Sequence, residues 1–236
     1  MINFEHVSKK FGEITALEEV SFKIDNGEFV FLTGSSGAGK TTLIKLILGE
    51  YLPSGGEIEV AGVKVNKIAR RKLYLWRRKL GVIFQDYKLL PNQTIFENVS
   101  LPLRFRKLSP VDIGEKTERA LGLVGLKERM ALFPAQLAGG ELQRACLARA
   151  IVAAPEILLA DEPTGNLDPT TASEMIKLLK SVNEKGTTVL MATHNKEIVD
   201  TLKTRVIELN KGKVVRDEKE GKYHNQNQKS NIKNQN

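Results

Sequence analysis

The stretch that most constrains this chain is Gly34-Ser-Ser-Gly-Ala-Gly-Lys-Thr41, which fits the phosphate-loop pattern G-x-x-x-x-G-K-[ST]. Residues 28–33 before it have the composition of a buried strand, and residues 42–48 after it have that of a helix ending at Gly49. Glycines let backbone N–H groups converge on phosphate oxygens, and the helix N-terminus adds positive charge. Lys40 should reach the β- and γ-phosphates, and the Thr41 hydroxyl should bind Mg²⁺. The sequence therefore predicts a nucleotide site comprising Gly34, Ser35, Ser36, Gly37, Ala38, Gly39, Lys40, Thr41 and Thr42.

Composition limits where such a chain can work. Of its 236 residues, 41% are hydrophobic and 27% are charged, as in a globular protein with a core. The single cysteine, Cys146, lies in an apolar helical stretch, so we expect a small buried side chain and a reducing compartment. No apolar run approaches the roughly 20 residues of a membrane span, and the N-terminus does not resemble a signal peptide. Any role at a membrane therefore requires a partner.

The net charge of +8 is concentrated between Lys64 and Lys79. This run has two interpretations, a solvated helix face or a contact surface for acidic headgroups, and the sequence does not decide between them. No zinc-ligand spacing and no aromatic-studded basic groove is present, which makes a nucleic-acid reader unlikely.

The order of predicted elements indicates an α/β fold. A polar turn is expected at 8–12, a hairpin turn at Asn26-Gly27, a loop at 53–56 and a basic helix or turn at 69–79. Helices are expected at 94–99, 111–124, 141–154, 169–183 and 196–202. Strands are expected at 2–7, 16–24, 28–33, 57–65 (a pair turning at Ala61-Gly62), 80–84, 156–160, 187–192, 205–209 and 213–215. Alternating strands and helices predict a largely parallel sheet covered on both faces.

The chain divides into a core and an insertion. Residues 1–88 and 155–223 should form the α/β core with an antiparallel β subdomain, and residues 89–154 a helical subdomain within the same domain. Residues 224–236 are almost entirely Asn, Gln and Lys, which cannot bury apolar area, so we expect a disordered tail.

A second set of catalytic groups follows the strand at 156–160. Asp161 and Glu162 come directly after its apolar residues, and ligands of parallel sheets bind beyond the carboxyl ends of the strands. We expect Asp161 to hold Mg²⁺ and Glu162 to act as a general base or to polarise the attacking water.

Together these motifs resemble the ATP-binding-cassette (ABC) family of P-loop ATPases over nearly the whole chain. Residues 137–141, Leu-Ala-Gly-Gly-Glu, resemble the signature Leu-Ser-Gly-Gly-Gln, so the family role implies that Ala138, Gly139 and Gly140 contact nucleotide. The resemblance also implies that Gln85 contacts Mg²⁺ and senses the helical subdomain, that Asp168 is the D-loop aspartate, and that His194 contacts the γ-phosphate. Phe11 takes the place of the aromatic residue that stacks on adenine.

The family geometry implies an ATP-dependent homodimer in which each nucleotide lies between the phosphate loop of one copy and the signature of the other. Ala138 departs from the family serine, whose hydroxyl would donate a hydrogen bond to the γ-phosphate. We therefore expect weaker ATP-driven closure than an Ala138→Ser variant would show, because such a bond contributes about 1.5–3 kcal/mol. Phe11 in place of the more usual tyrosine should cost little, since the ring still stacks.

Residues 161–168 resemble the branch of the family that holds lipoprotein-release, macrolide-efflux and cell-division ATPases, and residues 1–9, 84–91 and 191–199 are most similar to the cell-division members. The resemblance implies a polytopic membrane partner and a peripheral place at the cytoplasmic face of the membrane, at the division site. A groove near residues 85–90 should receive a helix of the partner, with Phe84, Tyr87 and Leu89 as candidate contacts or as ordinary core residues.

Two alternatives stay open from the sequence. One is an exporter subunit that shares all of this chemistry, and the other is a cassette ATPase that acts on nucleic acid. A GTPase is disfavoured because residues 195–198, Asn-Lys-Glu-Ile, lack the aspartate of the guanine-specifying pattern.

Overall fold

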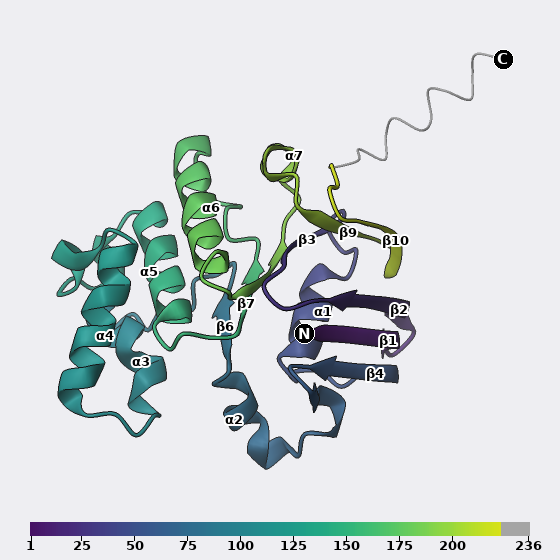
Figure 1. Cartoon of the computed structure of the whole chain (residues 1–236), viewed down its shortest axis with the longest axis horizontal. Helices are drawn as coiled ribbons and strands as arrows, with labels where there is room; N and C mark the ends of the chain where they lie inside the picture. Colours follow the sequence, from purple (N-terminus) through teal and green to yellow (C-terminus); the bar gives the residue numbers. More distant parts are fainter. Residues whose placement is uncertain (223–236) are drawn as a thin grey trace.

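The computed structural model describes residues 1–222 and contains two sheets (Figure 1). The larger sheet has six strands in the order β10 (Lys213–Glu218), β9 (Arg205–Asn210), β3 (Phe29–Thr33), β8 (Thr188–Ala192), β7 (Ile157–Asp161) and β6 (Leu80–Ile83). Its strands are parallel from β9 to β6, and β10 pairs antiparallel with β9. The prediction of a largely parallel sheet is confirmed. The predicted tail, 224–236, lies outside the described residues.

The smaller sheet is antiparallel and has the order β2 (Ile14–Ile24), β1 (Ile2–Phe11), β4 (Gly55–Val60) and β5 (Val63–Lys64). Helix α1 (Lys40–Ile47) lies between the two sheets, and its Leu43 and Ile47 share one buried core with side chains of both. We expected helices to cover both faces of the six-stranded sheet. One of these faces is instead covered by α1 together with the smaller, antiparallel sheet. The alternating direction of strand side chains builds both cores, because Val30 and Leu32 of β3 face this core whereas Phe29 and Phe31 face the other.

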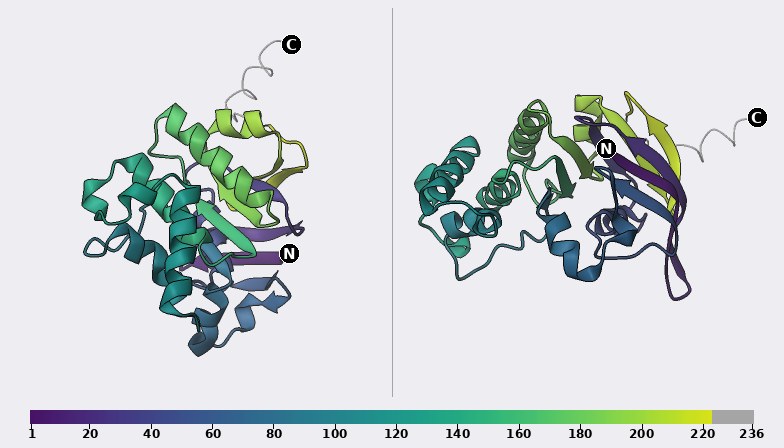
Figure 2. Two further views of the ribbon diagram at one scale, coloured as in Figure 1. Left: turned by 60° about the vertical axis from the view of Figure 1, so that its left-hand side comes forward. Right: turned by 60° about the horizontal axis from the view of Figure 1, so that its bottom comes forward.

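The helices α3 (Ile95–Arg104), α4 (Pro110–Leu123), α5 (Gly139–Ile151) and α6 (Pro169–Asn183) contribute to the second core. Figure 2 shows α3, α4 and α5 gathered on one side of the molecule and the antiparallel sheet on the opposite side. The shorter helices are α2 (Leu73–Arg77) and α7 (Lys196–Leu202). Among residues 1–222, no helix is long and apolar enough to cross a bilayer.

Several local predictions are confirmed with small shifts of boundary. The helices predicted at 169–183 and 196–202 match α6 and α7 exactly in extent, and Ser109 caps α4 by accepting a hydrogen bond from the Asp112 N–H. Helix α3 is longer than predicted and continues through Pro102, because Leu103 beyond it is buried in the core. Cys146 is buried, as expected.

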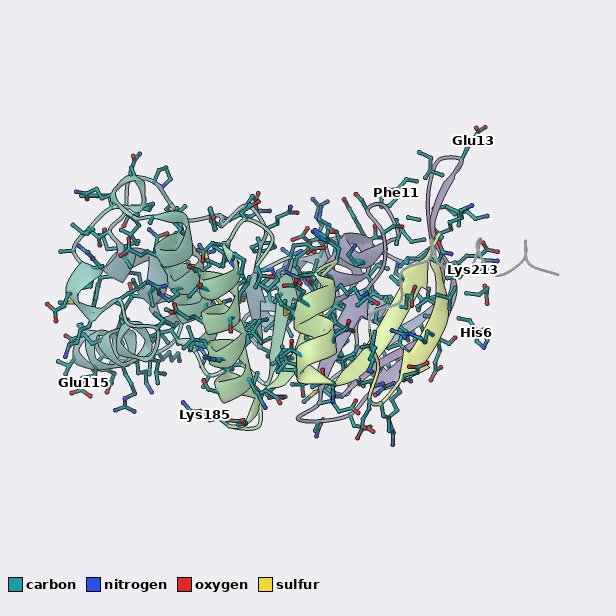
Figure 3. The ribbon with its side chains drawn as sticks, turned by 90° about the horizontal axis from the view of Figure 1, so that it is seen from above. His6, Phe11, Glu13, Glu115, Lys185 and Lys213 are labelled. Atoms are coloured by element: carbon teal, nitrogen blue, oxygen red, sulfur yellow. The ribbon has the colours of Figure 1, made fainter. Side chains whose placement is uncertain are left out.

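Three local predictions are wrong. Asn26-Gly27 turns the chain from β2 to β3, which belong to different sheets, so the turn does not close a hairpin. The predicted polar turn at 8–12 is strand as far as Phe11, because β1 and β2 pair to Ile14 in a hairpin whose tip, near Glu13, projects from the molecule (Figure 3). The predicted loop at 53–56 already contains the start of β4, where a Cβ on Gly56 would lie 2.3 Å from the His6 carbonyl oxygen, beside a bulge in β1.

Candidate nucleotide site

The phosphate-loop motif forms a tight turn between β3 and α1. Gly34 and Gly39 have φ angles of 143° and 108°, which L-residues rarely adopt. A Cβ on Gly34 would lie 2.3 Å from the Leu209 carbonyl oxygen, and one on Gly39 would lie 2.8 Å from the Ala16 carbonyl oxygen. The glycines are therefore required by close backbone packing as well as by the turn.

A cavity of about 520 Å³ opens over this loop. Its lining brings together five separate parts of the chain, and it consists of Ala16, Ser35, Ser36, Gly37, Ala38, Gly39, Lys40, Thr41, Thr42, Gln85, Glu162 and His194. The sequence analysis predicted all of these residues except Ala16. Ala16 lies in β2, and no sequence motif marks it as a residue that lines the cavity.

Lys40 lies at the base of the cavity and is almost completely buried. Its Nζ donates to the carbonyl oxygens of Gly34 and Ser35 at 2.8 and 3.1 Å. The same nitrogen is 3.7 Å from Oε1 of Glu162, so a cation at the start of α1 and a carboxylate just after β7 share one buried site.

Glu162 follows β7 and has a φ of 50°, a left-handed conformation that is uncommon for a residue with a side chain. Its N–H donates to the Ala192 carbonyl oxygen at the end of β8, which holds this backbone in place. Its side chain is 10% exposed, and Oε2 lies 3.0 Å from Nδ1 of His194 and accepts from the His194 N–H at 3.3 Å. The histidine side chain is 64% exposed, so the pair joins a buried carboxylate to an accessible imidazole.

Asp161, at the end of β7, is the other buried acid of the site. Burial raises the pKa of its carboxyl, and a hydrogen bond with Thr41 and the charge of Lys40 only partly oppose that increase. Its Oδ1 is buried and accepts no hydrogen bond from any described residue. An unsatisfied carboxylate oxygen beside a threonine hydroxyl is the donor set that a hard cation such as Mg²⁺ prefers.

Other predicted site residues lie away from this cavity. Phe11 packs edge-on against Tyr51, with ring centroids 5.0 Å apart, and Nζ of Lys9 lies 4.8 Å from its ring centroid. Asp168 caps α6 by accepting hydrogen bonds from Thr171 and the Thr170 N–H, and the Thr171 side chain lowers the pKa of this carboxyl.

The segment Ala138-Gly139-Gly140 begins α5 and does not line the cavity. A Cβ on Gly140 would lie 2.6 Å from Cγ2 of Thr171, so a side chain at this position would require Thr171, at the start of α6, to move. The Ala138 N–H donates to Oε2 of Glu141 at 3.0 Å, but alanine provides no side-chain cap for the helix.

The segment after Gln85 is tied to α5 by contacts that the sequence analysis missed. Arg149 donates to the carbonyl oxygens of Tyr87 and Lys88 at 2.7 and 2.5 Å, and the Cys146 thiol donates to that of Tyr87 at 3.2 Å. Burial raises the pKa of this thiol to about 11. Tyr87 and Lys88 both have positive φ, a conformation that only the folded chain reveals.

A glycine loop between a central parallel strand and a helix, with a lysine at its end and carboxylates at the end of the next strand but one, defines the class of P-loop nucleotide-binding proteins. A family model described as ABC transporter matches residues 17–165, which is more than half of the chain. The chain belongs to the ABC transporter family and is an ATPase of the ABC type.

The chain is similar to proteins of known name. The cell division ATP-binding protein FtsE of Bacillus subtilis (strain 168) is 47% identical over 224 residues, which cover 94% of this chain and 98% of that protein. FtsE of Escherichia coli (strain K12) is 45% identical over 213 residues, which cover 90% and 96%. Among solved structures, the ATP-binding cassette MJ0796, a dimer in a post-hydrolysis state with bound ADP and Pi, is 38% identical with a TM-score of 0.86, covering 94% of this chain and 100% of that one.

Proposed function

We propose that this chain is the ATP-binding and ATP-hydrolysing subunit of a cell-division complex, and that it acts with a polytopic membrane protein of the FtsX type. The main observation in support is the cavity over the phosphate loop, where Lys40, Glu162 and His194 lie together. The similarity to FtsE over nearly the whole chain supports the choice of complex. ATP-driven movement would be passed through the membrane partner to peptidoglycan hydrolases, at the cytoplasmic face of the membrane and at the division site.

We propose a role for each group that lines the cavity or lies beside it. The N–H groups of the phosphate loop and Lys40 would bind the phosphates, and Lys40 would exchange its contacts with carbonyl oxygens for contacts with phosphate oxygens. Thr41, Asp161 and Gln85 would hold Mg²⁺, which neutralises phosphate charge when bound.

Hydrolysis requires an oriented water. Glu162 would accept the water proton at its carboxylate, to which the His194 N–H donates, while the Ala192 carbonyl oxygen accepts from the Glu162 backbone N–H and holds the backbone in place. His194 contacts this carboxylate through Nδ1, and we assign its Nε2 to the γ-phosphate. The left-handed backbone at Glu162 fits a residue whose position is set by chemistry at some cost in conformational energy.

We infer that a second copy completes the site. Ala138, Gly139 and Gly140 begin a helix of their own but do not line the cavity of the same chain. They would supply N–H groups to the nucleotide of the partner copy, and Asp168, next to Thr171 on α6, would lie at the same dimer interface. Phe11 would stack on adenine, with Tyr51 supporting its ring.

We further propose that residues 89–154 act as a subdomain that responds to the membrane partner. A second cavity, of about 500 Å³, lies between α2, β6 and the helices α3 and α5, and its lining includes Phe84, Lys88, Leu101, Phe105 and Arg149. We assign this groove to a cytoplasmic helix of the partner. Phe84 lines it, whereas Tyr87 and Leu89 pack against the core, so only Phe84 of the three candidate contacts remains assigned to the groove.

The test is purification of the tagged Glu162→Gln variant with ATP from native membranes. We expect an FtsX-type protein to co-purify, and less of it with Phe105→Asp, which changes a 59% exposed ring of the groove. Phe133→Asp, at a 43% exposed ring outside the groove, is the matched control and should retain the partner. Recovery of an exporter permease in its place, or of no membrane protein, would contradict the proposal.

A further inference from the structure

The excess positive charge of the chain is concentrated in one stretch that the nucleotide site does not use. Between Val60 and Gln85 there is no acidic residue, and there are eight basic ones: Lys64, Lys67, Arg70, Arg71, Lys72, Arg77, Arg78 and Lys79. Eight positive charges equal the net charge of +8 of the whole protein. Most of the stretch between β5 and β6 folds as short helical turns and α2, and α2 lies at the lower edge of the molecule in Figure 1.

Some of these cations have structural partners. Lys64 and Lys67 both form ion pairs with Glu57, at 2.7 and 2.8 Å. Arg77 donates to the carbonyl oxygens of Leu48 and Gly49, which follow the end of α1. By contrast, Arg70, Arg71 and Lys72 are exposed and have no ion pair with any residue from 1 to 222. Three adjacent cations are therefore presented to the surroundings of the protein.

Helix α2 is held in one orientation by its inner face. Trp76 is 3% exposed, and its Nε1 donates to the Ile47 carbonyl oxygen at 2.8 Å. With Trp76 fixed inward, Tyr74 and Leu75 remain 55% and 46% exposed beside the basic turn. Apolar and aromatic side chains are thus displayed among cations by an anchored helix.

Arg78 links this surface to the groove that we assign to the membrane partner. Its guanidinium lies 5.0 Å from the ring centroid of Tyr74 and 5.8 Å from that of Phe105, and all three residues line the groove. The exposed cations and the groove are therefore neighbours, so a membrane that approaches one also approaches the other.

We propose that the α2 basic patch, formed by Arg70, Arg71, Lys72, Tyr74, Leu75 and Arg78, binds anionic phospholipid headgroups directly. Adjacent cations attract the acidic surface of a membrane, and aromatic and leucine side chains enter the headgroup region beside them. A single type of attraction gives weak membrane binding, so the charge of the turn at Arg70–Lys72 and the apolar area of the adjoining helix α2 would act together. This lipid contact needs neither nucleotide nor the proposed partner, so it departs from our sequence-based expectation that any role at a membrane requires a partner.

The test is co-sedimentation of the full chain with vesicles of phosphatidylcholine alone or with phosphatidylglycerol, without nucleotide. We expect binding to the anionic vesicles that weakens as salt rises, and little binding to the neutral ones. Replacing Arg70, Arg71 and Lys72 together by Gln should lower the binding constant on the order of 100-fold, since each basic residue near an anionic surface contributes about fivefold.

A matched variant separates the patch from net charge. Lys177, Lys180 and Lys185 are exposed on or just beyond α6, away from α2, and their joint replacement by Gln removes the same charge. This control should keep vesicle binding within about twofold, since the patch is intact. An equal loss in both triple variants would overturn the proposal, because it would show an effect of overall charge only.

The apolar part of the patch has its own test. Leu75→Ala should reduce binding to anionic vesicles about fivefold at high salt, where charge is screened. Leu123→Ala, at a leucine of similar exposure on α4, should have no effect. Salt-sensitive binding of duplex DNA without binding to anionic vesicles would overturn the lipid assignment. Because vesicle binding needs no partner, either this inference or the proposed complex with FtsX can fail while the other stands.

Discussion

The phosphate loop and the signature segment both present backbone N–H groups at the start of a helix, α1 and α5 respectively, but their surroundings differ. Around the loop, a single chain brings the Lys40 cation, the Glu162 carboxylate and His194 together in one cavity. Around Ala138-Gly139-Gly140, the contacts are with α6 and with Tyr87 of the same chain, and none of them is catalytic. The first region lines a cavity within one chain, and the second lies outside that cavity, which is why we propose that it acts on the nucleotide of a second copy.

This difference suggests a division of labour in which nucleotide binding within one copy and association of two copies depend on different residues. If the comparison is right, changes in the cavity should alter the isolated chain, whereas changes in the signature should alter only the association of two copies.

The largest expected effect is on turnover in Glu162→Gln. Loss of the group that orients water should lower kcat about 10²- to 10⁴-fold while ATP binding is retained. Steady-state phosphate release and equilibrium ATP binding are the measurements. Glu156→Gln changes an exposed carboxylate just before the same strand and should leave both unchanged. Substantial turnover in Glu162→Gln would remove this residue from the mechanism.

A smaller effect is expected on nucleotide affinity in Lys40→Ala. The lysine would make charged hydrogen bonds to phosphates, so its loss should weaken ATP binding about 10- to 100-fold. Titration with a fluorescent ATP analogue measures this. Lys45→Ala, a cation on the same helix that does not line the cavity, is the control and should bind nearly as wild type. Unchanged affinity in Lys40→Ala would mean that the loop does not bind phosphate as proposed.

The signature is tested by Ala138→Ser. The new hydroxyl should add a hydrogen bond to the γ-phosphate in the closed dimer and raise the ATP-dependent association constant about tenfold. Sedimentation with ATP, and with ADP as control, measures the change. Because serine also caps α5 better than alanine, a higher Tm is expected in either case and does not count as support. Equal dimerisation of the two proteins would show that the departure from the family serine has no consequence.

The smallest effect concerns the pH dependence of stability through Asp161. Its pKa is raised in the folded state, so the fold binds a proton more tightly than the unfolded chain, and this stabilisation is lost as pH rises through the folded pKa. Asp161→Asn cannot ionise and should therefore unfold at a Tm about 2–4 °C higher than wild type at neutral pH without Mg²⁺. In acid, where Asp161 is protonated in both the folded and the unfolded wild type, the Tm values of the two proteins should become equal.

Calorimetry across pH, repeated with Mg²⁺, checks this expectation. Added Mg²⁺ should stabilise the wild type and not Asp161→Asn, since only the carboxylate binds the ion well. A gap between the two Tm values that is constant with pH would contradict the role given to burial of this carboxyl.

Much of the fold was predictable because its local signals agree with its global structure. Apolar strands that alternate with amphipathic helices predicted the parallel sheet. The start of α4 at Ser109-Pro110 and both ends of α6 were also predicted from the sequence. The wrong local predictions arose because the sequence does not show which strands pair with one another. Asn26-Gly27 is a turn in sequence and in space, but nothing local states that the strands on its two sides enter different sheets.

The site shows the same division. All but one of the residues that line the cavity were predicted from the loop motif, from the acids after a buried strand or from the family resemblance. The structure brings these residues together in one cavity. Their chemical roles stay predictions. The place of Ala16 in the cavity lining and the hydrogen bonds from Arg149 to Tyr87 and Lys88 could not be predicted. An alanine that lines a cavity and a backbone carbonyl that accepts a hydrogen bond have no characteristic sequence pattern.

The sequence by itself determined the class of this protein, because a glycine loop with its lysine allows few other uses, and it determined where positive charge is concentrated. Only the tertiary structure decided which charges act together. It buried Lys40 and Glu162 in one cavity, and it left Arg70, Arg71 and Lys72 exposed beside an anchored helix. The physical reason is that strand pairing and burial bring together residues far apart in the chain, and these determine the solvation and the partners of each charge.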